Sequence, residues 1–330
     1  MSIDAVITWV DGADPAHQQR LAAYLAQRGG TRPRTAHSTR FSDAGEIDYC
    51  VTSIFRFAPW LRRIHIVSDA QTPTLVRRLR GTPYADRVDV VDHRRIFVGF
   101  EQHLPTFNSR AIISVLWRIA GLSEDFVYFN DDMLLLREVA PTDFFRDGKI
   151  VLRGEWRRQP AGLRSQRIKA LARRLRGTSA TRVGNLDAQQ ASARLAGFTD
   201  RYYRLFHNPF PMRRSTLEAF FARHPDLLAK NVGYRLRSND QFKTEALATH
   251  LAIANDDAIL DNRLHTVQLK PSEQWYPRMK RKMTRADGDA HAAFLVVQSL
   301  EMASHRAQAA ILDWLDRRVG KLDALLAAAQ

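Results

Sequence analysis

The chain has 330 residues, 45% of them hydrophobic and 26% charged, as is ordinary for a soluble globular protein with one large domain or two. With 50 Lys and Arg against 35 Asp and Glu residues, its net charge of +15 favours anionic partners: nucleotides, nucleic acid, acidic polymers or the inner membrane surface. The single cysteine excludes an internal disulfide, and the lack of a signal peptide or membrane-spanning run predicts a cytoplasmic location.

The first predicted element is a strand at residues 3–10, an apolar segment rich in β-branched residues. It is followed by Asp14 and Pro15, which are typical of the cap and first residue of a helix ending before Gly29. Asp11 therefore lies on a loop that leads from a strand to a helix.

The next elements also alternate between helix and strand. Asp43, with Glu46 three residues later, predicts the start of a helix. Apolar strands are predicted at residues 64–69 and 88–91, with a short helix at residues 75–79 between them.

A further helix is expected from Asn108 to Gly121, and an apolar run then ends in Asn130, Asp131 and Asp132. Such a continuous run is typical of a buried parallel strand, and ligands of open α/β sheets bind beyond the carboxyl ends of the strands. Adjacent carboxylates at that place suit Mg²⁺ or Mn²⁺. The alternative is an ordinary turn, since Asn and Asp are common turn residues.

The spacing of these elements predicts an α/β fold, Rossmann-like, with a mostly parallel sheet, flanking helices and a largely helical C-terminal part. At least three strands are expected to end in an aspartate, namely Asp11, Asp69 and Asp131. The composition divides the chain into an α/β core at residues 1–152, a basic insertion at 153–200 and a mostly helical part at 201–330.

The basic insertion contains a helix candidate at residues 163–176. It would make peripheral contact with an anionic inner membrane, or else form a solvated surface loop. Later helices are expected to start near Ser215, with Glu218 completing a capping box, and near Ser238. The pattern from residue 290 to the end is read as helical.

Strand-end aspartates combined with abundant arginine are suited to a metal-bound phosphate ester. Arg110 and Arg237 are candidates to clamp a phosphate, because guanidinium donors form a fork. His207 is a candidate acid or base, although a histidine before Asn-Pro also has a structural reading. The chain has no P-loop, no G-x-G-x-x-G after its first strand and no G-x-S-x-G elbow.

At this point the chain resembles the Stealth family of bacterial capsule and exopolysaccharide phosphotransferases, related to the catalytic part of animal GlcNAc-1-phosphotransferase. The matching blocks are IDAVITWVDGADP, the stretch from RFSD through APWLRRIHIVSDAQTP, LPTFNS and GLSEDFVYFNDDMLL, then HNPFPM with RSNDQF, and more weakly LKPSEQWYP.

The resemblance implies transfer of a sugar-1-phosphate from a nucleotide diphosphate sugar to a hydroxyl of a growing polysaccharide. Nucleoside monophosphate would leave, and a phosphodiester would form. The core at residues 1–152 would bind the nucleotide sugar and a divalent cation, Mg²⁺ or Mn²⁺. The positions on family motifs are Asp11, Asn108, Asp131, Asp132, His207 and Arg237, and, with less defined roles, Arg40, Glu46 and Asp240.

We assign His207 as the general base, with Asp11 as the alternative, and Arg237 as the stabiliser of developing charge. Asp131 and Asp132 would hold the metal. The expected substrate-binding residues are Arg40, Glu46, Asp69, Asn108, Arg110 and Asp240.

Two other functions fit parts of the sequence. One is a metal-dependent glycosyltransferase, in which the acceptor attacks the anomeric carbon and nucleoside diphosphate leaves. The other is a non-enzymatic binder of nucleic acid or another polyanion, based on the net charge alone. Clustered strand-end carboxylates would repel such a partner, so nucleic acid is not expected.

Overall fold

The computed structural model describes residues 2–30, 45–159 and 184–329. The predicted basic helix at residues 163–176 and the candidate Arg40 lie outside the described residues.

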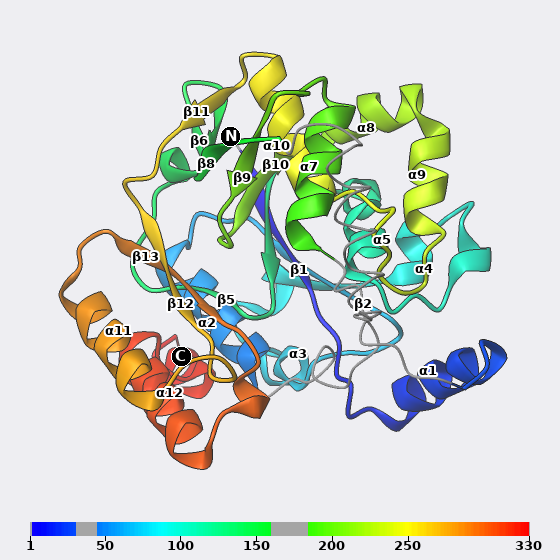
Figure 1. The fold of residues 1–330 in the computed structure, drawn as a ribbon. Helices are drawn as coiled ribbons and strands as arrows, with labels where there is room; N and C mark the ends of the chain where they lie inside the picture. Colours follow the sequence, from blue (N-terminus) through cyan, green and yellow to red (C-terminus); the bar gives the residue numbers. More distant parts are fainter. Residues whose placement is uncertain (1, 31–44, 160–183, 330) are drawn as a thin grey trace, which may run out of the picture.

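The central sheet has, among the described residues, five strands in the order β10-β4-β1-β2-β3 (Figure 1). Their bounds are β1 (Ile3–Thr8), β2 (Ile64–Ser68), β3 (Val88–Asp92), β4 (Asp125–Asn130) and β10 (Phe210–Arg213). β4, β1, β2 and β3 run parallel, and β10 is antiparallel to β4. The predicted Rossmann-like, mostly parallel sheet is therefore confirmed. Thr8 pairs with both Val67 and Asn130, so three carboxyl ends meet at one edge.

The N-terminal half contributes five α-helices among the described residues. They are α1 (Pro15–Gln27), α2 (Glu46–Phe57), α3 (Thr74–Arg78), α4 (His93–Ile96) and α5 (Ser109–Ile113). The α1 start is confirmed, because the Asp14 carboxylate accepts from the backbone N–H of Ala16 at 2.8 Å. The α2 cap is Gly45, with φ 92°, rather than the predicted Asp43, which lies outside the described residues.

The helix predicted from Asn108 to Gly121 is wrong beyond Ile113, where α5 ends. A 3₁₀ turn, η5 (Leu116–Arg118), replaces its second half. β-Branched residues lose side-chain freedom in helices, and the buried Ser114 hydroxyl bonds back to the carbonyl of Arg110 at 2.8 Å, a contact that bends helices.

The C-terminal half is helical, but several strands join it to the N-terminal half. The strands outside the central sheet are β5 (Met133–Leu135), β6 (Phe145–Arg146), β7 (Lys149–Leu152), β8 (Gly154–Arg158), β9 (Arg201–Leu205), β11 (Ala258–Leu260), β12 (His265–Leu269) and β13 (Ala292–Val297). The helices are α7 (Asn185–Leu195), α8 (Arg214–Arg223), α9 (Pro225–Val232), α10 (Thr244–Ala254), α11 (Tyr276–Gly288), α12 (His305–Arg318) and α13 (Leu322–Ala327).

Three helix expectations in this half are wrong. The segment from residue 290 begins with β13, a run of six buried apolar residues that pairs with β12 and β5. The Ser215–Glu218 capping box is absent: Ser215 donates to Glu124, while Glu218 pairs with Arg214 at 3.3 Å. The helix expected near Ser238 begins later, as α10.

One hydrophobic core joins the two halves of the described chain. It includes Phe126 of β4 and Phe294 of β13, both fully buried, together with Trp314 of α12. A smaller cluster, built around Leu21, Phe107 and Leu236, packs α1 against two loops. Within the described residues, none of the helices has the length and apolar character needed to cross a membrane.

Candidate active site

A cavity of about 1130 Å³ opens at the carboxyl ends of β1, β2 and β4. Its floor includes Thr8, Val67 and Asn130, the last or next-to-last residues of those strands. Its walls come from both halves of the chain, because α5, α7, β10, the loop after β12 and the end of β13 all contribute residues. The sheet therefore places the cavity where the sequence predicted ligand binding.

Most of the candidate residues line this cavity. They are Glu46, Asp69, Arg110, Asp131, Asp132, His207 and Arg237. Asp11, Asn108 and Asp240 are not among the lining residues, and Arg40 lies outside the described part of the chain.

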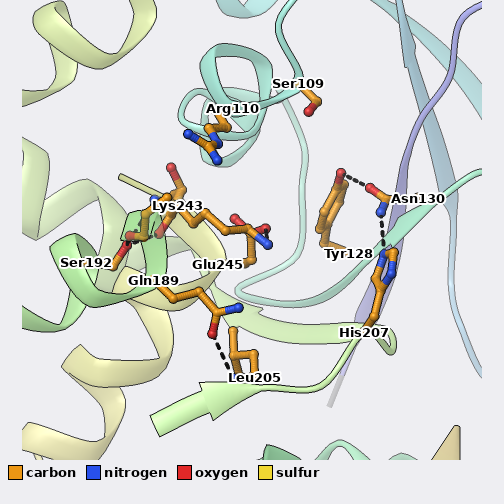
Figure 2. A network of polar contacts seen from close by, with 12 residues as sticks. Ser109, Arg110, Tyr128, Asn130, Gln189, Ser192, Leu205, His207, Lys243 and Glu245 are labelled. Atoms are coloured by element: carbon orange, nitrogen blue, oxygen red, sulfur yellow. Dashed lines mark hydrogen bonds and ion pairs between the residues drawn. The ribbon is translucent and has the colours of Figure 1, made fainter. Parts of the chain in front are cut away.

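His207 is held in a hydrogen-bonded row with Thr8, Tyr128, Asn130 and Gln298, which we call the His207 chain. Figure 2 shows its central part, from Tyr128 through Asn130 to His207. The Tyr128 hydroxyl donates to the Asn130 side-chain oxygen at 2.5 Å, and Thr8 Oγ1 lies 2.9 Å from the same hydroxyl. Asn130 Nδ2 lies 3.0 Å from His207 Nε2, and Gln298 Nε2 lies 3.2 Å from His207 Nδ1. Side-chain amides thus flank both ring nitrogens and fix the orientation of the ring, although a neutral ring has only one acceptor nitrogen and so takes a hydrogen bond from only one of the two NH2 groups.

The environment keeps the His207 ring neutral. Burial lowers the pKa of His207 to about 3, with further lowering by the charges of Lys243, Lys270 and Arg237. These three cations line the same cavity. A bound anion would compensate their charges and raise the basicity of the ring.

Asp131 and Asp132 form the turn between β4 and β5. The backbone N–H of Asp132 donates to Asp131 Oδ1 at 3.1 Å, and the N–H of Val297 donates to the Asp132 carbonyl at 3.1 Å. Asp132 Oδ1 is buried without a hydrogen-bond partner among the described residues, and so is Glu301 Oε1 at the same cavity. Burial raises the pKa of Asp132 to about 7.

These unsatisfied oxygens fit a hard divalent cation. The described residues contain no group of three or more His, Cys, Asp or Glu side chains arranged for a metal. Mg²⁺ is often bound through one or two carboxylates, with substrate phosphates and water completing its shell, so two aspartates are sufficient. Eight carboxylates and five Lys or Arg side chains line the cavity in the described part of the chain, which also favours an added cation.

The cationic side chains approach the cavity from the other side, as Figure 2 shows for Arg110 and Lys243. Arg110 donates to the carbonyls of Ser238 and Gly184 at 2.8 and 3.0 Å. Arg237 donates to the Ser109 hydroxyl at 2.5 Å, and Lys243 pairs with Glu245 at 2.7 Å. Polar partners therefore hold the three cations at the cavity wall.

Several lining residues were missed by the sequence reasoning: Lys243, Glu245, Lys270, Gln298 and Glu301. Tyr128, which bonds to Asn130 from behind the cavity lining, was missed as well. Gln298 comes directly after the apolar run of β13, just as Asn130 comes at the end of the apolar run of β4. The sequence therefore contained the same pattern, a polar residue at the end of an apolar strand, at both places. At β13 it was not recognised, because that segment was read as helical. No periodicity marks Lys243 or Lys270, which lie on loops.

Asn108 lies at the start of α5, and its side chain is fully buried. Its Oδ1 accepts from the N–H of Arg110 at 3.1 Å, while its Nδ2 donates to the Tyr234 carbonyl at 2.6 Å and to Gln241 Oε1 at 2.9 Å. Asn108 thus joins α5 to the loop that carries Arg237.

Asp11 and Asp240 make local contacts. Asp11 Oδ1 accepts from the N–H of Ala13 at 2.8 Å, and Gln71 bonds both the N–H and the carbonyl of Asp11. Asp240 lines a separate cavity of about 230 Å³ beside Lys230.

The other end of the cavity, around the ends of β1 and β2, is more apolar. Trp9, Val10 and Phe107 line it. Thr106 Oγ1 and His93 Nδ1 are buried there without hydrogen-bond partners among the described residues. Burial lowers the pKa of His93 to about 4, so its ring is neutral at pH 7. Flat apolar walls with a few unsatisfied polar atoms are typical of a small-molecule site.

Comparison with known families gives two matches in chain order. The sequence model of Stealth protein conserved region 1 matches residues 1–29, and that of conserved region 2 matches residues 40–152. The second match includes the Asp131–Asp132 pair.

Curated relatives share about a third of their aligned residues with this chain. Exopolysaccharide phosphotransferase SCO6023 of Streptomyces coelicolor is 34% identical over 240 residues, which cover 72% of this chain and 37% of the relative. Capsular polysaccharide phosphotransferase cps1A of Actinobacillus pleuropneumoniae is 30% identical over 246 residues, covering 72% and 62%. Capsular polysaccharide phosphotransferase LcbA of Aeromonas hydrophila is 32% identical over 244 residues, covering 72% and 62%. The chain thus matches between 37% and 62% of the lengths of these relatives.

Among solved structures, a crystal structure of LgtC aligns with 89% of this chain and 86% of its own, at 11% identity and a TM-score of 0.42. So low a score carries no functional information.

Proposed function

The chain belongs to the Stealth family, and we propose that it transfers a sugar-1-phosphate from a nucleotide diphosphate sugar to a hydroxyl of a capsule or exopolysaccharide acceptor. The observation that supports this most is the meeting of separate family motifs at one cavity. Asp131 and Asp132 of one motif line the same space as His207 and Arg237 of two others. The relatives named above are polysaccharide phosphotransferases.

We propose that the donor lies along the cavity. Its base would bind at the apolar end between Trp9 and Phe107, where Thr106 and His93 offer unsatisfied polar atoms. Its diphosphate would lie between Arg237, Lys243 and the aspartate pair, since forked guanidinium donors suit phosphate oxygens.

Asp131 and Asp132 would hold the divalent cation, Mg²⁺ or Mn²⁺, which would neutralise charge on the diphosphate. The unsatisfied Oδ1 of Asp132 supports this role. Asp132 must be ionised to act as a ligand, and a cation beside it would lower its raised pKa.

In the reaction the acceptor oxygen attacks the β-phosphorus, the bond from that phosphorus to the nucleoside monophosphate breaks, and the acceptor proton moves to a base. We propose His207 as that base rather than Asp11, because His207 lines the cavity and its ring orientation is fixed. Bound diphosphate would offset the three cations that contribute to its low pKa. Arg237 would stabilise the charge that develops on the phosphoryl oxygens.

Turnover by three variants tests these roles. His207→Ala, Asp132→Asn and Arg237→Ala should each lower kcat/KM at least about 100-fold, since a lost charge stabiliser or base costs a few kcal/mol. Arg235→Ala is the matched control, because Arg235 lies on the same loop as Arg237 but does not line the cavity. Its guanidinium donates instead to the Gln102 carbonyl. Near-normal turnover by both His207→Ala and Asp132→Asn would refute the assignment.

A further inference from the structure

One side of α11 presents a row of positive charge that the proposed reaction does not use. Arg278, Arg281, Lys282 and Arg285 recur at the spacing that places residues on one side of a helix, and we call them the basic stripe. The three arginines are exposed, whereas Met279 and Met283 on another side of α11 are buried. No ion pair joins the stripe to a carboxylate in the described part of the chain.

The basic stripe begins beside the cavity. Lys270, Ser272 and Glu273, on the loop after β12, line the cavity wall, and Trp275 follows two residues later at the start of α11. The Lys282 ammonium donates to the Gln268 carbonyl on β12. Burial lowers the pKa of Lys282, and the charges of Arg278 and Lys270 lower it further, so these cations lie near one another. Positive charge thus extends from Lys270 at the cavity wall to α11, with Glu273, which pairs with Lys270 at 3.4 Å, as the one carboxylate on the loop between them.

Trp275 adds an apolar surface at this junction. Its side chain is 84% exposed, the largest value among the exposed large hydrophobic residues of the described chain. Indole rings combine a flat apolar face with a polar edge, so they bind partners that are partly polar.

We propose that Trp275 and the basic stripe bind the growing acceptor polymer, a chain of sugars joined by phosphodiesters, as it leaves the cavity. This inference rests on the proposed function, because each transfer adds a phosphodiester with one negative charge to the acceptor. Successive cycles make the acceptor a polyanion with apolar sugar faces. Arginines spaced along a helix pair with its phosphates, and Trp275 packs against a sugar face.

The test measures binding of two probes to the full chain by calorimetry at 50 and 200 mM salt, and binding to phosphatidylglycerol vesicles is measured beside them. One probe is a synthetic oligomer of six hexoses joined by phosphodiesters, and the other is a neutral hexasaccharide. The variants are the triple change Arg278→Gln, Arg281→Gln, Arg285→Gln and the single change Trp275→Ala. The control is the triple change Arg63→Gln, Arg80→Gln, Arg158→Gln, at exposed arginines outside α11 that do not line the cavity.

The stripe variant should bind the phosphodiester oligomer about tenfold more weakly at 50 mM salt, with a shallower salt dependence, because three surface charge pairs are lost. Trp275→Ala should weaken binding of both probes about fivefold, since the lost contact is apolar. The control variant should match the parent protein.

Equal affinities of the stripe and control variants for the phosphodiester oligomer would overturn the inference. This includes the case in which only binding to phosphatidylglycerol vesicles drops, which would assign the surface to a membrane. Stripe-dependent binding without any sugar-phosphate transfer would leave the polymer surface standing and refute the reaction. Sugar-phosphate transfer, together with polymer binding that does not depend on the stripe, would refute the polymer surface and leave the reaction standing.

Discussion

Asp132 is half-buried just after β4, and its buried Oδ1 has no hydrogen-bond partner in the described chain. A pKa of about 7 in the folded state, against 3.8 for an ordinary aspartate, means that the folded protein holds this proton more tightly than the unfolded chain. Stability contributed by this group is therefore present at low pH and is lost as the pH rises. Such strain at a functional residue is typical of active sites.

We predict that Asp132→Asn stabilises the protein while it abolishes activity. The gain in the free energy of unfolding should grow between about pH 4 and pH 7 and level off at about 4 kcal/mol above that range. Urea titrations at a series of pH values would measure it. Asp200→Asn, at an exposed carboxylate, should show no comparable trend. A loss of stability at pH 8 on removing the Asp132 charge would contradict this account.

Tyr128 tests the His207 chain from outside the cavity, because it bonds to Asn130 and Thr8 but does not itself line the cavity. Its side chain is fully buried, and burial raises its pKa well above the usual value, so the hydroxyl stays protonated and can donate to Asn130. Tyr128→Phe should lower kcat about tenfold with little change in KM for the donor, because Asn130 and the His207 ring lose their fixed orientation.

Tyr203→Phe is the matched control for that change. It also removes a hydroxyl from a buried tyrosine, but one without a hydrogen-bond partner among the described residues. Similar kcat values for the two phenylalanine variants would show that the His207 chain does not position the base.

At the scale of elements, Asn108 holds α5 against the loop that carries Arg237. Asn108→Ala removes three hydrogen bonds and leaves the Tyr234 carbonyl and Gln241 buried without this partner, so a loss of about 3 kcal/mol in unfolding free energy is expected. KM for the donor should rise as Arg237 loses its support. Asn255→Ala, at an exposed helix end, should have little effect on either quantity. Normal stability and KM in the Asn108 variant would refute this positioning role.

The strands that build the site could be predicted because their local sequence is enough to identify them, without knowledge of what they pack against. β1 and β4 contain the apolar runs at residues 5–7 and 126–129, and buried parallel strands give that pattern. The β13 segment has the same pattern, but it was read as part of a long helical stretch. α5 also ended early, because β-branched residues and the Ser114 back-bond outweighed its apolar periodicity.

The aspartate pair, His207 and Arg237 could be named from residue type and motif, but their meeting could not be derived from spacing. It depends on β10 pairing with β4, which brings His207 beside Asn130, and on β13, which delivers Gln298. Lys243 and Lys270 reach the cavity from loops, where the sequence contains no periodic signal.

At the scale of the whole molecule, positive charge and carboxylates are separated. The chain has a net charge of +15, yet acidic side chains outnumber cationic ones at the cavity in its described part. The positive excess lies elsewhere, including the basic stripe on α11. A metal would then draw the diphosphate into the cavity, while the outer charge would attract the acceptor polymer.

The two halves of the chain also share one core, and β4, β5, β7 and β8 each pair with a strand from beyond residue 200. The full chain should therefore unfold in a single cooperative transition. Residues 1–152 expressed alone should lack a sharp transition, because β4 and β5 lose their partners. Calorimetry of both proteins would measure this, and a sharp transition of the fragment would show an independent domain.

The nucleotide released is the most direct measure of the central claim. The purified protein would be incubated with Mg²⁺, a short capsule-type acceptor and a panel of nucleotide sugars, and the products separated and examined by phosphorus NMR. We expect nucleoside monophosphate, with one phosphorus per transferred sugar appearing in the glycan as a phosphodiester. Release of nucleoside diphosphate with no phosphorus in the glycan would mean attack at the anomeric carbon and would contradict the proposed reaction.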